Sequence, residues 1–176
     1  SAFEGMGVAR EVSYAVLAEA AIITALLTLC VQSGSVSLAT MLAPSAGAGA
    51  ALLAAGLFGV LLAENCRVPF DDPNTHLELT MIHEVMVLDH SGPPLAAILH
   101  GASLKLLLFA VLLTEAVLPL GKLSLLPASG VLGASGFGVS RVVGLVESLL
   151  ARLAFRRVPL LLTTAFLFCL FALLAA

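Results

Sequence analysis

The sequence predicts an all-α fold, a polytopic transmembrane helix bundle of about five spans with an additional helix in one loop. Of the 176 residues, 60% are hydrophobic and only 11% are charged, whereas about 25% are charged in an ordinary soluble domain. The mean hydropathy is +1.12. Five apolar stretches approach the length of about 20 residues with which a helix crosses a bilayer. In lipid, the backbone must satisfy its hydrogen bonds internally, which favours helices over isolated strands.

The five expected spans form a single integral membrane domain over residues 1–176. Helix-breaking residues lie near their ends, as boundaries require, at Gly34, Pro44, Pro93, Pro94, Pro119, Pro127 and Pro159. We expect the spans at about 12–31, 47–63, 95–118, 131–150 and 158–174. The loop 64–94 separates the second span from the third.

Positive charge is distributed unevenly between the connections, which predicts the orientation in the membrane. The N-terminal flank, the loop 64–94 and the connection after the fourth span carry Arg10, Arg67, Arg152, Arg156 and Arg157. Because basic connections stay in the cytoplasm, we expect the N-terminal flank and loop 64–94 to be cytoplasmic. The C-terminus is then expected on the opposite face of the cell's inner (plasma) membrane. The chain starts at Ser1 and not at a Met, which suggests a piece of a longer protein.

The loop 64–94 is expected to contain a helix of its own, in the cytoplasm or at the membrane interface. Asp72 can cap this helix, Pro73 suits its first turn, and Thr75-x-x-Glu78 forms a possible capping box. A helix over about 73–88 places His76, Thr80 and His83 along one stripe. We therefore expect this segment to fold back against the bundle.

Ionisable residues inside the spans predict proton movement. Each costs about 2.5–3.5 kcal/mol to insert, so the deeply placed Glu19, Lys105, Arg141 and Glu147 call for a role. Alternating acids and bases along a hydrated path can hold and release protons as their surroundings change. Acidic residues at the cytoplasmic side would supply such a path, namely Glu64, Asp71, Asp72, Glu78 and Glu84. For Arg10, Glu11, Glu115 and Arg152, near the span ends, snorkelling or pairing is the simpler explanation.

Other chemistries find less support in the sequence. The three cysteines are isolated, so no cysteine-ligated iron–sulfur cluster is expected. His83-Glu84 begins like a zinc-protease HExxH, but Val87 replaces the second histidine. His76, His83 and His90 follow at seven-residue spacing, for which ordinary hydrogen bonding is a more frequent role than metal binding. With 8 Lys and Arg against 11 Asp and Glu, nucleic-acid binding is excluded. We expect no catalytic residue and no metal in this chain.

The loop also resembles a known family. Glu64-Asn-Cys-Arg-Val-Pro-Phe-Asp-Asp-Pro, followed by Thr75-His-Leu-Glu-Leu-Thr-Met-Ile-His-Glu, is similar to the respiratory complex I subunit 1 family of NADH dehydrogenase membrane subunits. The histidine-containing continuation resembles the branch found in membrane-bound [NiFe] hydrogenases, such as formate hydrogenlyase and hydrogenase-4. Arg10 ahead of Glu19, and Glu147-Ser followed by Arg152 and Arg157-Val-Pro, support the resemblance. The chain looks like the C-terminal five spans of a subunit of about eight.

The resemblance implies a membrane anchor and coupling subunit that joins a peripheral electron-transfer arm to proton or ion translocation. Its implied partners are the hydrogenase large and small subunits, an iron–sulfur protein and antiporter-like membrane subunits. The nickel–iron centre and the iron–sulfur clusters then belong to those partners, with no cofactor in this chain. The proton-transfer candidates are Glu19, Glu64, Asp71, Glu78, Glu84, Lys105, Arg141 and Glu147. The loop candidates for the partner interface are Arg67, Pro69, Phe70, Asp72, His76 and His83.

Three alternatives remain open at this stage. The chain can be the quinone-binding membrane subunit of an NADH:quinone oxidoreductase, although the histidine-containing continuation argues against that branch. It can be a stand-alone ion transporter, although no inverted repeat is visible within five spans. It can also be an anchor that moves no protons, because a conducting carboxylate and a structural one look alike in a sequence.

Overall fold

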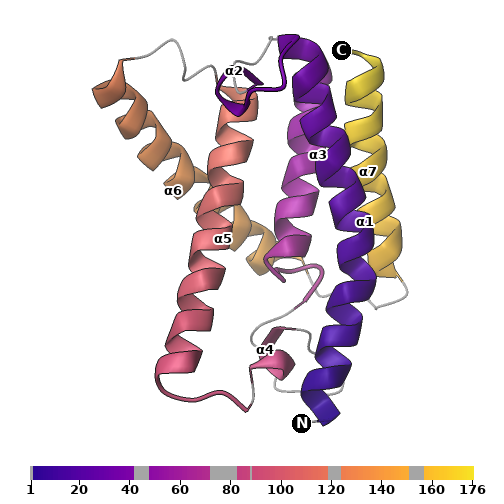
Figure 1. Ribbon diagram of the computed structural model, residues 1–176, viewed down its shortest axis with the longest axis vertical. Coiled ribbons are helices and arrows are strands. Elements are labelled where there is room, and N and C mark those ends of the chain that lie inside the picture. The colour runs from indigo at the N-terminus through magenta and orange to yellow at the C-terminus, as the bar shows by residue number, and fades with distance from the viewer. Residues whose placement is uncertain (1, 42–47, 72–82, 88, 119–123, 151–156) are drawn as a thin grey trace.

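The computed structural model describes residues 2–41, 48–71, 83–87, 89–118, 124–150 and 157–176, and every regular element within them is a helix. The all-α prediction is therefore confirmed. Figure 1 shows the long helices running roughly lengthwise along the molecule, with α6 inclined across them. The helices are α1 (Ala2–Ser33), α2 (Leu38–Met41), α3 (Ala48–Glu64), α4 (His83–Met86), α5 (Pro93–Val117), α6 (Leu125–Leu149) and α7 (Val158–Leu174).

All five expected spans correspond to helices, with different ends. Among the described residues, α1, α5 and α6 are long and apolar enough to cross a membrane, whereas α3 and α7 have 17 residues each. Helix α1 begins about ten residues before the expected span, and α6 begins at Leu125 instead of about 131. Pro127 lies within the first turn of α6, where the missing backbone N–H costs no helical hydrogen bond.

The core lies where α1, α3 and α7 pack against one another (Figure 1). Small side chains of α1, among them Ala18, Ala21 and Ala25, are almost fully buried there and allow α1 to approach its neighbours closely. From α7, Leu162 and Cys169 are fully buried against them. The hydroxyl of Thr28 donates to the Thr24 carbonyl oxygen at 2.9 Å and lies 3.4 Å from that of Cys169, which links α1 to α7.

Helices α5 and α6 form the outer part of the bundle. Helix α5 packs on α3, and α6 packs chiefly on α5. Only the C-terminal half of α6 reaches the core, through the buried Val143. In Figure 1 the N-terminal half of α6 stands clear of α5. Most of the α6 surface is therefore left uncovered by the described residues.

Glycine and proline residues mark the end of α1 and the beginning of α5. Helix α1 ends before Gly34, whose φ of 63° is the left-handed conformation typical of a C-terminal cap. Gly92, with φ 61°, precedes α5, and Pro93 occupies its first turn. Of the loop helix expected over 73–88, residues 73–82 and 88 lie outside the described residues. Helix α4 is its described part, and it packs on α1.

Candidate functional site

The candidate site is built around the chain turn that follows α3. The Arg67 N–H donates to the Leu62 carbonyl oxygen at 2.9 Å, and the Phe70 N–H donates to that of Arg67 at 2.8 Å. These bonds hold residues 65–71 in a compact turn in which Val68, Phe70 and Asp71 are buried. Cys66 adopts a φ of 48° and the Val68–Pro69 peptide bond is cis. The turn thus redirects the chain after α3 and places polar side chains beside α1 and α5.

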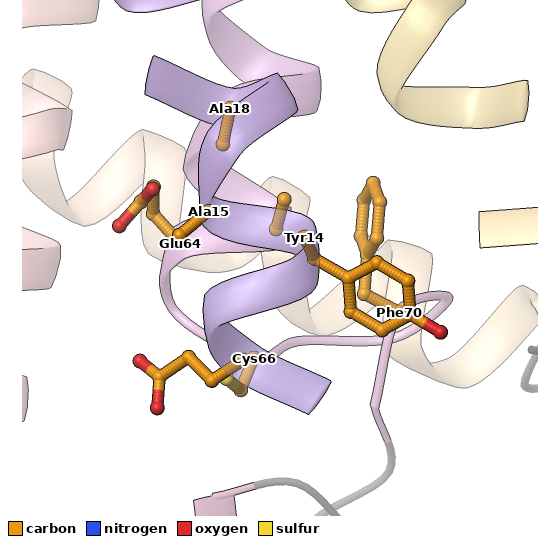
Figure 2. Close-up of a pocket in the computed structure, with 8 residues that line it drawn as sticks. Tyr14, Ala15, Ala18, Glu64, Cys66 and Phe70 are labelled. Carbon is orange, nitrogen blue, oxygen red and sulfur yellow. The ribbon is translucent and has the colours of Figure 1, made fainter. Parts of the chain in front are cut away.

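Two adjoining cavities open beside this turn. The smaller one, of about 30 Å³, lies between α1 and the end of α3 and is lined by Glu11, Tyr14 and Phe70 among others. Figure 2 shows the Glu64 carboxylate on one side of α1 and the rings of Tyr14 and Phe70 on the other. The larger cavity, of about 510 Å³, lies between the turn and α5. Glu11, Glu64 and Cys66 line both cavities, so the two spaces share a polar wall.

An ion pair joins α3 to α5 at the larger cavity. Lys105 Nζ lies 2.7 Å from Glu64 Oε2, and the two side chains are 38% and 16% exposed, respectively. Both residues line the cavity. Glu64 is the last residue of α3 and Lys105 lies in the middle of α5, so the sequence separates them by 41 positions. The fold therefore places a half-buried lysine directly on the carboxylate that opens the family-like motif.

A second ion pair joins the turn to α6. Arg67 Nη1 lies 3.3 Å from Glu147 Oε1, with both side chains about one-third exposed. Since Arg67 lies three residues after Glu64, the two pairs anchor the same turn to two different helices. Exposed ion pairs contribute little stability, so we interpret this contact as fixing the position of the turn.

The deepest charged residue of the site is Asp71, which is 2% exposed. Its Oδ2 accepts a hydrogen bond from the His83 backbone N–H at 3.2 Å, which ties α4 to the turn. Negative charge gathers around the neighbouring Cys66. Burial, and next the charge of Glu11 and Asp71, raise the pKa of the Cys66 thiol from 9.0 to about 12. At neutral pH this thiol is un-ionised.

The structure brings eight of the predicted site residues into or directly beside this region and places two elsewhere. Glu64, Asp71, Lys105, Arg67 and His83 line the larger cavity, and Glu147 pairs with Arg67. Pro69 and Phe70 are buried within the turn. Glu19 and Arg141, in contrast, are exposed on the outer surfaces of α1 and α6. Glu84 belongs to α4. Asp72, His76 and Glu78 lie outside the described residues.

Sequence reasoning did not assign a site role to Glu11, Tyr14 or Cys66. Glu11 and Cys66 line both cavities, and Tyr14 lines the smaller one. A signal was available for α1, because Glu11, Tyr14 and Ala18 follow at helical spacing and share one face. The sequence carried no corresponding signal for Cys66, whose position depends on the turn. Among the described residues, no group of three or more His, Cys, Asp or Glu side chains could hold a metal ion.

Comparison with known families decides the assignment of the chain. The family described as NADH dehydrogenase matches residues 1–176, which is the entire sequence. The chain belongs to the NADH dehydrogenase family, of the complex I subunit 1 type. No curated protein and no solved structure matches it. The resemblance of the loop motif is thereby confirmed at the level of the family.

Family membership indicates the surroundings of the chain. Members of the complex I subunit 1 family are membrane subunits of multi-subunit oxidoreductase complexes. The apolar helices agree with a place in a membrane. A subunit of such a complex has surfaces that face other subunits and surfaces that face lipid. Glu19 and Arg141 are therefore exposed in this chain considered alone, without the other subunits of the complex.

Proposed function

We propose that this chain is the membrane anchor and coupling subunit of a membrane-bound [NiFe] hydrogenase complex of the formate hydrogenlyase type, and that its cavity beside α5 moves protons. The proposed neighbours are the hydrogenase large and small subunits, an iron–sulfur protein and antiporter-like membrane subunits. The contact between Lys105 and Glu64 carries the proposed proton movement, because it sets an acid and a base 2.7 Å apart at a cavity of about 510 Å³. The histidine-containing continuation of the loop motif supports the hydrogenase branch.

The chemistry of this pair suits a proton that is bound and released in turn. An adjacent cation favours the ionised form of a carboxylate, and its withdrawal favours the protonated form. Glu64 and Lys105 come from different helices, so a shift of the turn 65–71 changes their separation. Drawing the turn away from α5 lets Glu64 take up a proton from cavity water. Returning it restores the pair and releases that proton.

The second ion pair connects this event to the rest of the loop. Arg67 holds the turn on Glu147 of α6, and Asp71 holds it on α4. In the proposal, loop 64–94 faces the peripheral electron-transfer arm, and reduction chemistry there displaces the loop. A displacement that reaches either Arg67 or Asp71 is passed along the turn to Glu64, the last residue of α3. Glu19, Glu78, Glu84, Arg141 and the other predicted proton-transfer residues stay predictions.

The proposed orientation places this site at the cytoplasmic face of the plasma membrane. In Figure 1 the N-terminus and α4 lie at one end of the molecule and the C-terminus lies at the other, and the chain leaves the end of α3 toward α4. Arg10 lies in α1 near the N-terminus and Arg67 lies in the turn that leads toward α4, and basic segments favour the cytoplasm. This arrangement supports a cytoplasmic loop and a C-terminus on the opposite face.

The test replaces Lys105 in the full-length protein within its complex. Lys105→Met removes the base, Lys105→Arg retains the charge, and Ser103→Ala changes another polar residue of the same cavity as a matched control. Proton movement is followed in membrane vesicles, and hydrogen-dependent dye reduction is followed in parallel. We expect Lys105→Met to lower proton movement by about tenfold or more, as for the loss of a proton-transfer group, with dye reduction intact. Unchanged proton movement would refute the role of the pair.

A separate experiment tests the hydrogenase branch. The full-length tagged protein is purified in mild detergent with its partners, and nickel, iron, flavin and enzymatic activity are measured. We expect stoichiometric nickel together with hydrogen-dependent dye reduction. Iron and flavin with NADH oxidation but no nickel would instead indicate a quinone-reducing complex. That outcome would overturn the branch and leave the family unchanged.

A further inference from the structure

The outer face of α6 combines a row of small residues and a charged residue that neither the core nor the cavity uses. Gly130, Ala134 and Gly138 follow at intervals of four residues and are all exposed. Arg141 follows Ala134 by seven residues, which is about two helical turns, and therefore lies on the same face. The opposite face contains Val143, which is 4% exposed and belongs to the core.

The guanidinium of Arg141 points toward the middle of the span. It stacks over the ring of Phe137 at 4.7 Å from the ring centroid. Phe137 is the central residue of α6, twelve residues from Leu125 and twelve from Leu149. Helical side chains lean toward the N-terminus, which here leads away from the nearer helix end. Arg141 therefore does not extend toward the nearer interface, as a snorkelling arginine would.

This position calls for an anionic neighbour. An arginine in the centre of a bilayer costs about 2.5–3.5 kcal/mol on insertion scales when no partner compensates it. Among the described residues, no acidic side chain forms an ion pair with Arg141, and its described contact is the Phe137 ring. The face beside it carries small residues, and at Gly130 and Gly138 an added Cβ would meet no atom within 4 Å. Small residues at four-residue spacing let another helix approach closely.

We propose that this face of α6, defined by Gly130, Ala134, Gly138 and Arg141, docks a transmembrane helix of another subunit of the complex that presents a carboxylate to Arg141. The charge of Arg141 selects the chemistry of the partner, and the small residues set how closely its backbone approaches. The N-terminal half of α6 stands clear of α5 and offers this surface (Figure 1). The inference rests on family membership and on this geometry. It does not depend on the hydrogenase branch or on proton movement through the cavity.

Photo-crosslinking identifies the occupant of the face. A photoreactive amino acid replaces Ala134 in the full-length protein, within native membranes that contain the entire complex. The same probe at Ala97, an exposed alanine of α5, serves as the matched control. We expect the Ala134 probe to attach to a membrane subunit of the complex, at a helix that contains Asp or Glu. Attachment to lipid alone, or to another span of the same protein, would overturn the proposal.

Charge exchange then tests the role of Arg141. We expect Arg141→Glu and Arg141→Gln to lower the amount of that subunit recovered with the tagged protein by about threefold to fifteenfold, the range of polar contacts between membrane helices. Arg141→Lys should retain most of it. Replacing the partner's carboxylate by Arg should restore recovery with Arg141→Glu. Ala134→Leu should also weaken association, whereas Ala97→Leu should not. Unchanged recovery with Arg141→Glu at normal membrane levels would refute the proposal.

Discussion

The packing of α3 on α7 at Gly56 permits a quantitative prediction. A Cβ added at this glycine would overlap Cys169 Sγ and would lie 2.9 Å from the Ala165 carbonyl oxygen and 3.2 Å from the Cys169 backbone nitrogen. Two of these three atoms belong to the backbone of α7, and Cys169 is fully buried. Gly56→Ala therefore requires the two helices to separate, because no flexible side chain can absorb the added methyl group.

The expected magnitude follows from two opposing effects. Overpacking of a core costs about 1–3 kcal/mol, and contact with backbone atoms places Gly56→Ala near the upper end. Alanine is favoured over glycine in a helix by about 1 kcal/mol. The net loss in the free energy of unfolding is then about 2 kcal/mol, or about 30-fold in the folding equilibrium at about 1.4 kcal/mol per tenfold. Gly144→Ala is the control, because an added Cβ there meets no atom within 4 Å.

The assay is reversible unfolding in mixed micelles with increasing SDS, followed by circular dichroism. A double variant with Cys169→Ala removes the Sγ overlap but leaves the contact with the Ala165 oxygen. It should therefore recover part of the loss, measured as a coupling free energy against the two single variants. If Gly56→Ala were as stable as Gly144→Ala, the close approach of α3 to α7 would be incorrect. If Cys169→Ala gave no coupling, the overlap with Sγ would be incorrect.

Two further predictions concern the turn after α3. The pKa of the Cys66 thiol is raised from 9.0 to about 12, and only the thiolate reacts with iodoacetamide. At pH 8, alkylation of Cys66 should therefore be about 1,000-fold slower than alkylation of a cysteine introduced at an exposed position by Val36→Cys. The rate should rise about tenfold per pH unit; similar rates at pH 8 would contradict the buried position. Asp71→Ala should cost about 1–3 kcal/mol by removing the buried acceptor of the His83 N–H. Amide hydrogen exchange in α4 should be faster with Asp71→Ala than with Asp71→Asn, because asparagine retains an oxygen that can accept the His83 N–H. Equal exchange rates in the two variants would refute the hydrogen bond between the turn and α4.

The loop motif and the apolar stretches contained most of the information about class and family. The regions of the five longest described helices were predictable because about 17 or more apolar residues between helix breakers have few alternatives in a bilayer. The ends were less predictable, as at α6, where Pro127 marks the first turn and not a boundary. The loop acids Glu64 and Asp71 were predicted because they lie at the cytoplasmic side of the expected proton path and within the motif that resembles the family.

The sequence by itself determined that this chain is an all-helical membrane protein of the NADH dehydrogenase family, because composition and a contiguous motif are local properties. Only the tertiary structure decided which charges meet. It placed Lys105 on Glu64 and Glu147 on Arg67, and it turned Glu19 and Arg141 outward. Whether an ionisable residue faces a cavity, a partner helix or lipid depends on the rotation of its helix about its own axis. That rotation is fixed by packing between residues far apart in the chain, such as Gly56 against Cys169.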